Sequence, residues 1–268
     1  VLFYKGSLED SDTRNIAIVG TRKATEVGKK RVDTLLHELA GAGYHPNIIS
    51  GLAYGIDITA HTACVHYGLK AQAVLGHGLH MVYPASHKNM AEKILEQGGA
   101  LISEFPTCAQ ILPTNFLQRN RIVAGMSEAI LVAESPVKGG AMSTARQALS
   151  YNRDVMAIPG RPEDSTFSGC NLLIKQNIAA LVENVKDLLR ILNWPPLPTE
   201  PYQMSLDLFP VTNNEVLIME TLAKMGEQNI DQLHQLTRIP VHDLSVLLLK
   251  LELEGRVMQL PGNCYTLI

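Results

Sequence analysis

The chain has little of what disulfide-linked, zinc-binding and membrane-spanning proteins are built from. Its 268 residues include four cysteines and one tryptophan, and only 5% are aromatic. Cys64, Cys108, Cys170 and Cys264 are far apart and form no Cys-x-x-Cys pair, which argues against a zinc knuckle or a disulfide framework. No apolar run approaches the roughly 20 residues of a membrane-spanning helix, and no signal peptide begins at Val1. We therefore expect a cytoplasmic protein without a membrane partner.

Sequence signatures of several catalytic and cofactor-binding classes are also missing. The histidines form no His-Glu-x-x-His motif, so Asp57 and His61, four residues apart, are a weak candidate for a metal pair. There is no Gly-x-Ser-x-Gly nucleophile elbow. The loop Gly20-Thr21-Arg22 lacks the G-x-G-x-x-G spacing of a dinucleotide site, and residues 138–143 are not a Walker loop. The residues predict neither a metal nor a cofactor.

Charge is divided unevenly along the chain. The composition, 46% hydrophobic and 18% charged, is typical of a globular protein, and the net charge is −3. Residues 1–195 contain 19 Lys and Arg against 17 Asp and Glu, whereas residues 196–268 contain 4 against 9, giving +2 and −5. We expect the two parts to have different partners. Because residue 1 is not Met and residues 1–4 already look like a strand, we expect the chain to begin inside a longer gene product.

Apolar runs alternate with helical patterns over residues 1–192. After the strand at 1–4, further strands are predicted at 15–19, 47–49, 71–75, 100–103, 129–133, 155–158 and 179–182. Helices are predicted at 26–40, 56–67, 86–97, 116–126, 142–151 and 185–192. The strand runs lack the period-2 polarity of half-exposed strands, so helices should cover both faces. This pattern predicts an α/β fold with a doubly wound, mostly parallel, Rossmann-like sheet.

A different organisation follows residue 192. Residues 193–212 contain five prolines and no periodicity, which is typical of a linker. Helical stretches at 215–224, 230–235 and 241–254 precede two short strands, 257–260 and 264–267, around Pro261-Gly262-Asn263. Three helices closed by a hairpin predict a winged-helix domain at 213–268.

The stretch from Ser50 to Asp57 predicts an anion site. It follows an apolar strand and leads into a helix, where outward N–H groups and the helix dipole favour a phosphate or carboxylate. Loops at the carboxyl ends of strands converge in doubly wound sheets, so Arg22 and the glycines after Lys138 should lie nearby. These glycines, hydroxyls and cations suit phosphate.

Each candidate also has a purely structural interpretation. Arg22 could form a salt bridge, and Lys138 could be a solvated lysine in a turn. Arg119 and Arg121 point about 200° apart on a helix, so we expect one to face a ligand while the other supports the fold. Asp57 either caps the helix or orients the loop before it. Phe116 or Tyr54 would stack on a base or pack in the core.

Taken together, the loops resemble those of the DprA/Smf DNA-processing family. The motifs that carry the resemblance occur in order over residues 1–192 and are Val19-Gly20-Thr21-Arg22, Ser50 to Asp57 with Ala60-His61, Tyr83-Pro84, Ser103 to Pro106, Phe116-x-x-Arg119-Asn120-Arg121-Ile122, Lys138 to Ala141, Thr144-Ala145 and Pro159-Gly160. Gly140 stands where the family usually has serine, and Cys170 replaces a commoner threonine.

The resemblance implies a homodimeric protein that binds and protects single-stranded DNA and helps load RecA recombinase during natural transformation, without catalysis. The candidate DNA-binding residues are Arg22, Lys23, Ser50, Gly51, Gly55, Asn115, Phe116, Arg119, Asn120, Arg121, Lys138, Gly139 and Gly140. Clustering Arg22, Lys23, Arg119, Arg121 and Lys138 at one sheet edge would make a focused cationic pocket. The acidic winged helix is expected to contact protein.

Two other functions compete with this hypothesis. The chain could be a nucleotide-cleaving enzyme similar to the lysine-decarboxylase-like phosphoribohydrolases, but their Pro-Gly-Gly-x-Gly-Thr loop and following glutamate are replaced by Lys138 to Thr144 and Arg146. It could also be a ligand-sensing transcription regulator, which needs a basic recognition helix. Residues 241–254 contain only Lys250 against three acidic residues.

Overall fold

The chain folds into two separate units in a computed structural model that describes residues 1–8, 14–195, 213–260 and 262–267. Contacts divide it into Val1–Leu197 and Pro198–Ile268, and each unit has a hydrophobic core of its own. The predicted linker, 193–212, lies outside the described residues except for 193–195.

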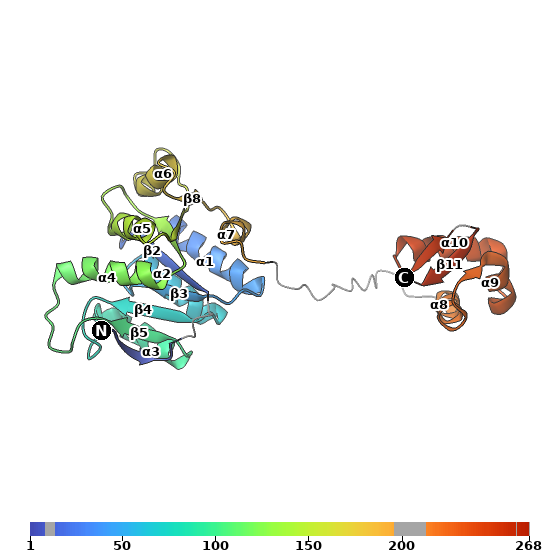
Figure 1. Ribbon diagram of the computed structural model, residues 1–268, viewed down its shortest axis with the longest axis horizontal. Helices are drawn as coiled ribbons and strands as arrows, with labels where there is room; N and C mark the ends of the chain where they lie inside the picture. The colour runs from blue at the N-terminus through green and yellow to red at the C-terminus, as the bar shows by residue number, and fades with distance from the viewer. Residues whose placement is uncertain (9–13, 196–212, 261, 268) are drawn as a thin grey trace. The chain divides into compact units, whose positions relative to one another are not determined.

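A sheet of eight strands runs through the described part of the first unit (Figure 1). In the spatial order β1-β5-β4-β3-β2-β6-β7-β8, the strands are Phe3–Gly6, Ala100–Ser103, Ala71–Leu75, Asn47–Ser50, Asn15–Gly20, Ala129–Glu134, Asp154–Ala157 and Ala180–Leu181. Every neighbouring pair is parallel except β1 and β5. Strands β3, β4, β5 and β6 are buried along their whole length, as their continuous apolar runs require. The predicted doubly wound, mostly parallel sheet is confirmed.

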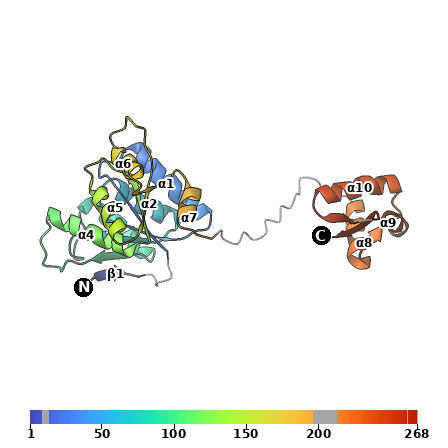
Figure 2. The same ribbon diagram turned by 45° about the horizontal axis from the view of Figure 1, so that its top comes forward.

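Helices cover both faces of this sheet. They are α1 (Glu26–Gly41), α2 (Ile56–Tyr67), α3 (Lys88–Glu96), α4 (Pro113–Met126), α5 (Gly140–Ser150), α6 (Ser168–Lys175) and α7 (Val185–Ile191). Helix α1 packs against α2 and α2 against α3, whereas α4 packs beside α5 (Figures 1 and 2). The chain moves outward from β2 through β3 to β5 and, in the other direction, from β6 through β7 to β8. Right-handed crossovers therefore place the helices that connect these two sets of strands on opposite faces of the sheet. The strand order reverses between β2 and β6, which is the switch point.

Some predicted boundaries differ from the structure. The helix predicted from Ser86 begins at Lys88, after a 3-10 turn. The helix predicted from Phe116 begins earlier, at Pro113, because proline suits a first helical position that needs no N–H donor. Helix α6 was not predicted, since serine, glycine and asparagine lower the helix propensity of its eight residues.

The second unit confirms the predicted winged helix. Its elements are α8 (Asn213–Met225), β9 (Gln228–Asn229), α9 (Ile230–Thr237), α10 (Val241–Leu253), β10 (Val257–Leu260) and β11 (Cys264–Leu267). Strands β10 and β11 form the predicted antiparallel hairpin, and the short β9, which was not predicted, pairs with β11. Three leucines of α10, Leu244, Leu248 and Leu251, enter the core of this unit. In neither unit does the described chain contain a helix long and apolar enough to cross a membrane.

Candidate functional site

A cavity of about 220 Å³ opens at the switch point of the large sheet. It is lined by the end of β2 and the loop after it, by the loop after β3 and the start of α2, by one side of α4, and by the start of α5. The polar and glycine residues in its wall are Gly20, Thr21, Arg22, Gly51, Asp57, Arg119, Asn120, Gly139, Gly140 and Thr144. The loops that the sequence predicted to converge do so here.

Asp57 holds the loop after β3 from within. Its Oδ2 accepts hydrogen bonds from the N–H groups of Gly51 at 3.1 Å and Ala53 at 3.4 Å. Between them, buried Leu52 has a φ of 55°, and its carbonyl accepts a hydrogen bond from His87 Nδ1 at 2.8 Å. Asp57 therefore orients the loop. These two N–H groups therefore point inward, and not outward as the sequence predicted.

Arg119 forms the floor of the cavity. The side chain is only 4% exposed, and its Nη1 donates a hydrogen bond to the Val74 carbonyl. A Cβ at Gly51 would overlap this guanidinium, which explains the glycine. Burial lowers the pKa of Arg119. The charge of Asp57 opposes this shift, and the charge of Arg22 adds to it. Burial also raises the pKa of Asp57, opposed first by the Arg119 charge. The floor is thus a buried cation beside a buried carboxyl group.

Arg22 is the exposed cation of the site. Its guanidinium lies 5.4 Å from the centre of the Phe116 ring, in a cation–π contact. Unlike Arg121, it makes no ion pair with a residue in the described ranges. Gly55, with a φ of 78°, lets α2 begin close to the Arg22 loop, because a Cβ there would overlap the Thr21 carbonyl. The charge of Arg22 is left to interact with a ligand.

The first turn of α5 lies in the cavity wall. Gly139 is the N-cap residue and offers no side-chain hydrogen bond, so the first turn is not capped. Gly140 and Ala141 follow it in the cavity wall, together with Thr144. The Met142 N–H donates to the Gly139 carbonyl at 3.2 Å, whereas the N–H groups of Gly140 and Ala141 precede this first hydrogen bond of the helix and lie at the positive end of its dipole. Ala141 and Thr144 were not among the predicted site residues; the glycine pair before the helix is the signal that indicates them.

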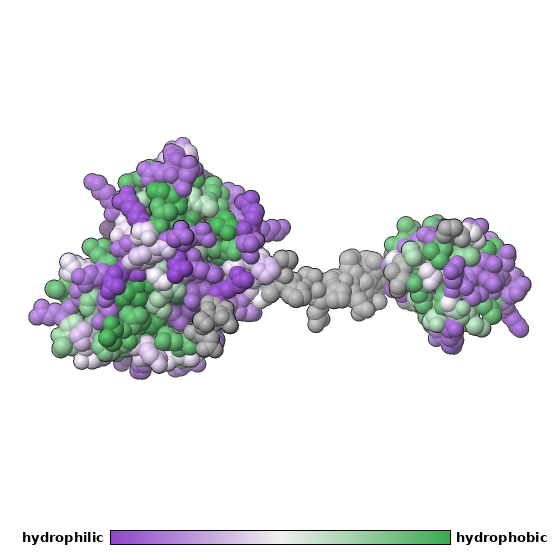
Figure 3. Space-filling view, in the orientation of Figure 1, coloured by the Kyte–Doolittle hydropathy of each residue, from purple (hydrophilic) through white to green (hydrophobic). Residues whose placement is uncertain are grey.

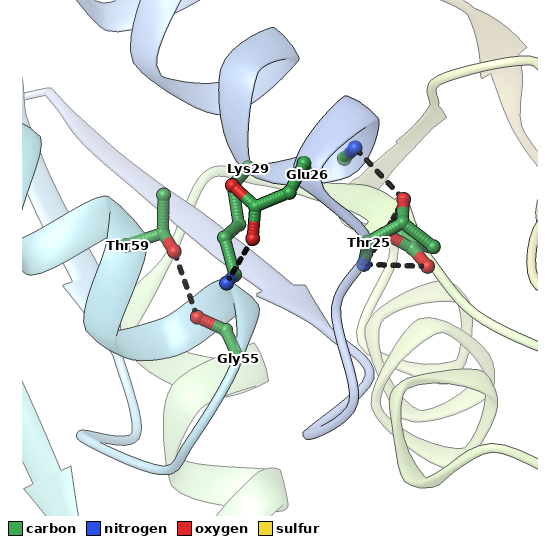
Figure 4. Close-up of polar contacts among 7 residues, drawn as sticks. Thr25, Glu26, Lys29, Gly55 and Thr59 are labelled. Carbon is green, nitrogen blue, oxygen red and sulfur yellow. Dashed lines mark hydrogen bonds and ion pairs between the residues drawn. The ribbon is translucent and has the colours of Figure 1, made fainter.

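The start of α1, by contrast, is closed (Figure 4). Thr25 Oγ1 accepts a hydrogen bond from the Gly28 N–H at 3.1 Å and donates one to buried Glu134 at 3.1 Å. The Thr25 N–H also donates to Glu134, at 3.0 Å. A carboxylate therefore already occupies the position where an anion would bind this helix.

A buried histidine lies on the same helix as Asp57. His61 is inaccessible to solvent, and neither ring nitrogen has a hydrogen-bond partner among the described residues. Burial, with smaller contributions from Arg119 and His87, lowers the pKa of His61 to about 3. In the described part of the chain, no three His, Cys, Asp or Glu side chains come together as metal ligands.

The predicted site residues fall into two groups. Those in the cavity wall are Arg22, Gly51, Phe116, Arg119, Asn120, Gly139 and Gly140. The other six are Lys23, Ser50, Gly55, Asn115, Arg121 and Lys138. Buried Ser50 donates to the Ile18 carbonyl and Asn115 to that of Gln110, so both support the fold. The DNA contacts of all thirteen stay predictions.

Of the five cations expected to cluster, two line this cavity, and Lys23, Arg121 and Lys138 do not. Arg22 and Arg119 line it, whereas Arg121 pairs with Glu104. Lys138 lines a neighbouring cavity with Arg146, beyond the start of α5. The two arginines of α4 do separate as their helical spacing predicts, one toward the cavity and one away from it.

Comparison with known proteins gives matches over both units. The family described as DNA recombination-mediator protein A matches residues 1–193, and the DprA winged helix domain matches residues 215–263. Protein Smf of Escherichia coli is 36% identical over 268 residues, which covers 98% of this chain and 70% of that protein. The DNA processing protein DprA of Streptococcus pneumoniae is 37% identical over 189 residues, covering 70% of this chain and 65% of the relative.

Two solved structures are similar to the large unit. The X-ray structure of DprA from Streptococcus pneumoniae has a TM-score of 0.65 and 36% identity, covering 70% of this chain and 65% of that one. A structure of DNA processing protein A from Helicobacter pylori, described as showing that protein's single-stranded DNA binding mode, has a TM-score of 0.62 and 30% identity. It covers 72% of this chain and 86% of the relative's.

Proposed function

The chain belongs to the DNA recombination-mediator protein A (DprA/Smf) family, and on that premise we propose that the cavity beside Arg22 binds the backbone of single-stranded DNA. The observation that carries the proposal is the exposed guanidinium of Arg22 in the same cavity as the uncapped first turn of α5. Both attract phosphate, and buried Arg119 adds positive charge beneath them. A cavity of about 220 Å³ is large enough for a phosphate group and is far too small for a duplex.

The single-stranded DNA binding described for the Helicobacter pylori relative supports this proposal. We extend it to protection of the strand and loading of RecA recombinase during transformation and recombination, by a homodimer in the cytoplasm. The description of the family as a recombination mediator supports this extension.

The winged helix is proposed to contact protein. Lys250, the cation of α10, lies 2.6 Å from Glu215 Oε1 and 3.8 Å from Glu254 Oε1, so its charge is compensated within the domain. The outer face of α10 exposes Val246, Leu249 and Leu253. Hydrophobic side chains are visible among hydrophilic ones on the surface of this unit (Figure 3). A helix with these side chains lacks the cations needed to bind a phosphate backbone.

The proposal is tested by replacing the exposed arginine. Arg22→Ala should weaken binding of a single-stranded oligonucleotide at least about tenfold, because a charge-assisted contact to phosphate is lost. The slope of log affinity against log salt should become shallower by about one. Fluorescence anisotropy at several salt concentrations measures both quantities. Arg190→Ala is the matched control, since Arg190 is an exposed arginine of α7 that pairs with Asp187 and does not line the cavity. Equal affinities and slopes for wild type and Arg22→Ala would contradict the proposal.

A second measurement separates binding from nucleotide cleavage. Incubation of the purified chain with nucleoside monophosphates should release no free base, as followed by chromatography. Base release that co-purifies with the chain and scales with its concentration would instead support the phosphoribohydrolase alternative.

A further inference from the structure

The pairing of β2 with β6 shifts its register at the edge of the sheet where the cavity opens. Val19 pairs with Val132. The next residue, Gly20, pairs with Glu134, so Ala133 is skipped in this pairing. Such irregularities change the direction of the side chains that follow them and are common beside functional sites. The shift brings Glu134 next to Gly20, where an added Cβ would lie 2.9 Å from the Glu134 carbonyl oxygen.

Glu134 holds the loop that carries Arg22 at both of its ends. The Glu134 carbonyl accepts a hydrogen bond from the Thr21 N–H at 2.7 Å, immediately before Arg22. The Glu134 carboxylate accepts hydrogen bonds from the Thr25 N–H at 3.0 Å and from the Thr25 hydroxyl at 3.1 Å, three residues after Arg22. One residue therefore fastens the loop on either side of the exposed arginine.

Glu134 does not itself reach the cavity. It is fully buried and is not among the residues that line the wall. Gly28 leaves room for the carboxylate, because a Cβ at that position would overlap Glu134 Oε2. Any effect of this side chain on a ligand must therefore pass through the loop that it holds.

Arg22 needs this support because the charge beneath it has the same sign. Buried Arg119 lies in the same cavity wall, and the charge of Arg22 contributes to the lowered pKa of Arg119. Their repulsion favours an Arg22 side chain that turns away toward solvent. The cation–π contact with Phe116 opposes this at the side chain, and the hydrogen bonds to Glu134 oppose it at the backbone. A loop already held in its binding conformation loses less entropy when a phosphate binds.

We propose that Glu134 is a positioning residue for strand binding, which keeps Arg22 over the cavity by fastening Thr21 and Thr25. This inference rests on the proposed function. It assigns a buried acid a favourable part in binding a polyanion, although the negative charge of Glu134 by itself repels phosphate. Because the two effects on affinity have opposite signs, substitution of Glu134 separates them.

The test is Glu134→Gln in the full chain, titrated with a single-stranded oligonucleotide by fluorescence anisotropy. Loss of repulsion alone would tighten binding, whereas loss of positioning should weaken it about fivefold and make the salt slope shallower. Glu134→Asp keeps the charge but withdraws the carboxylate from Thr25 by one methylene, so it should weaken binding too. Glu215→Gln is the matched control, since Glu215 is a buried glutamate of the winged helix, and it should leave the affinity unchanged.

A double-mutant cycle with Arg22→Ala shows whether Glu134 acts through the arginine. In the Arg22→Ala background, Glu134→Gln should weaken binding no further, because no guanidinium is left to position. Additive losses would overturn the inference, since Glu134 would then act by supporting the fold as a whole. Unchanged or tighter binding by Glu134→Gln would also overturn it, while leaving strand binding through Arg22 intact. A normal affinity of Arg22→Ala would overturn the proposed function together with the inference. Should Glu134→Gln not fold, Glu134→Asp is carried through the same cycle.

Discussion

Two buried ionisable side chains, Asp57 and Arg119, determine how single residues of the cavity can be tested. Asp57 holds the N–H groups of Gly51 and Ala53, and Arg119 lies against Gly51 beneath the same loop. Removing either would leave the other buried without its counter-charge, at a cost of about 3–5 kcal/mol in the free energy of unfolding. Loss of binding after such a change would report loss of structure. Arg22, exposed and outside this network, gives the interpretable substitution.

His61 predicts a pH dependence of stability at the residue scale. Its pKa is about 3 in the folded chain and near 6.5 when unfolded, so between these values the unfolded state binds more protons. The free energy of unfolding should therefore fall as the pH drops from 6.5 toward 3, by up to about 1.4 kcal/mol per pH unit. His61→Leu should flatten this dependence. Urea titrations between pH 5 and 7.5, followed by the fluorescence of Trp194, measure it.

Trp194 suits this experiment because it is the one tryptophan of the chain and is buried in the large unit. His66→Leu is the matched control, since His66 is exposed on the same helix. An identical slope for wild type and His61→Leu would contradict the prediction. Asp57 contributes in the opposite direction, because its raised pKa makes the folded state bind protons more readily, but it is present in both proteins.

At the scale of elements, the helices α1, α2, α4 and α5 all begin near the cavity, and they differ in how their first turns are closed. Helix α4 begins at Pro113, which has no N–H group to offer an anion. The first turn of α1 is closed by Thr25 and Glu134. At the start of α2, the Ile56 N–H donates a hydrogen bond to the Thr21 carbonyl at 3.2 Å. Helix α5 begins with glycines and has no side-chain cap. Phosphate affinity should therefore depend on α5.

The closed start of α1 carries a stability prediction. Thr25→Ala removes the hydrogen bond to Gly28 and one of the donors to buried Glu134, which should lower the free energy of unfolding by about 1–2 kcal/mol. Thr25→Ser keeps the hydroxyl and both hydrogen bonds, so its free energy of unfolding should fall much less. Urea denaturation of the three proteins checks this. Similar losses for the alanine and serine variants would show that the threonine methyl group, and not the cap, stabilises the helix.

At the scale of the whole molecule, the two units have separate cores and opposite charge balance. Residues 1–195 carry a net charge of +2 and residues 196–268 a net charge of −5. The cavity is built entirely from residues of the first unit. Strand binding should therefore be a property of that unit alone.

Deletion of residues 213–268 tests this division of labour. The shortened chain should bind a single strand within about threefold of the full chain, because every residue of the cavity remains and a fragment with excess negative charge is removed. Anisotropy titrations of both proteins at one salt concentration measure the ratio. The isolated segment 213–268 should fold cooperatively around its own core and bind the same strand weakly. A large loss of affinity on deletion would show that the winged helix contacts DNA.

Hydrophobic patterning made most of the architecture predictable. Runs such as Ala71–Leu75 and Ala100–Ser103 are strands with the predicted boundaries, because their full burial between helices requires uninterrupted apolar residues. The alternation of strands and helices also predicted where the loops converge, since parallel strands end at one edge of the sheet. Helix α6 escaped prediction because its pattern is short and carried by weak helix formers.

The side chains that form the site were decided by contacts between distant segments. Helical spacing separated Arg119 from Arg121, but only the packing of α4 over β4 placed Arg119 against Val74 and Gly51. Asp57 turned the nearby N–H groups inward because a buried carboxylate must be hydrogen-bonded, and these were the donors within reach. Tyr83 met Phe116 because the loop after β4 lies against the start of α4, 33 positions further along the chain. Local pattern specifies which elements form, whereas desolvation and packing between elements select which of their polar groups remain free for a ligand.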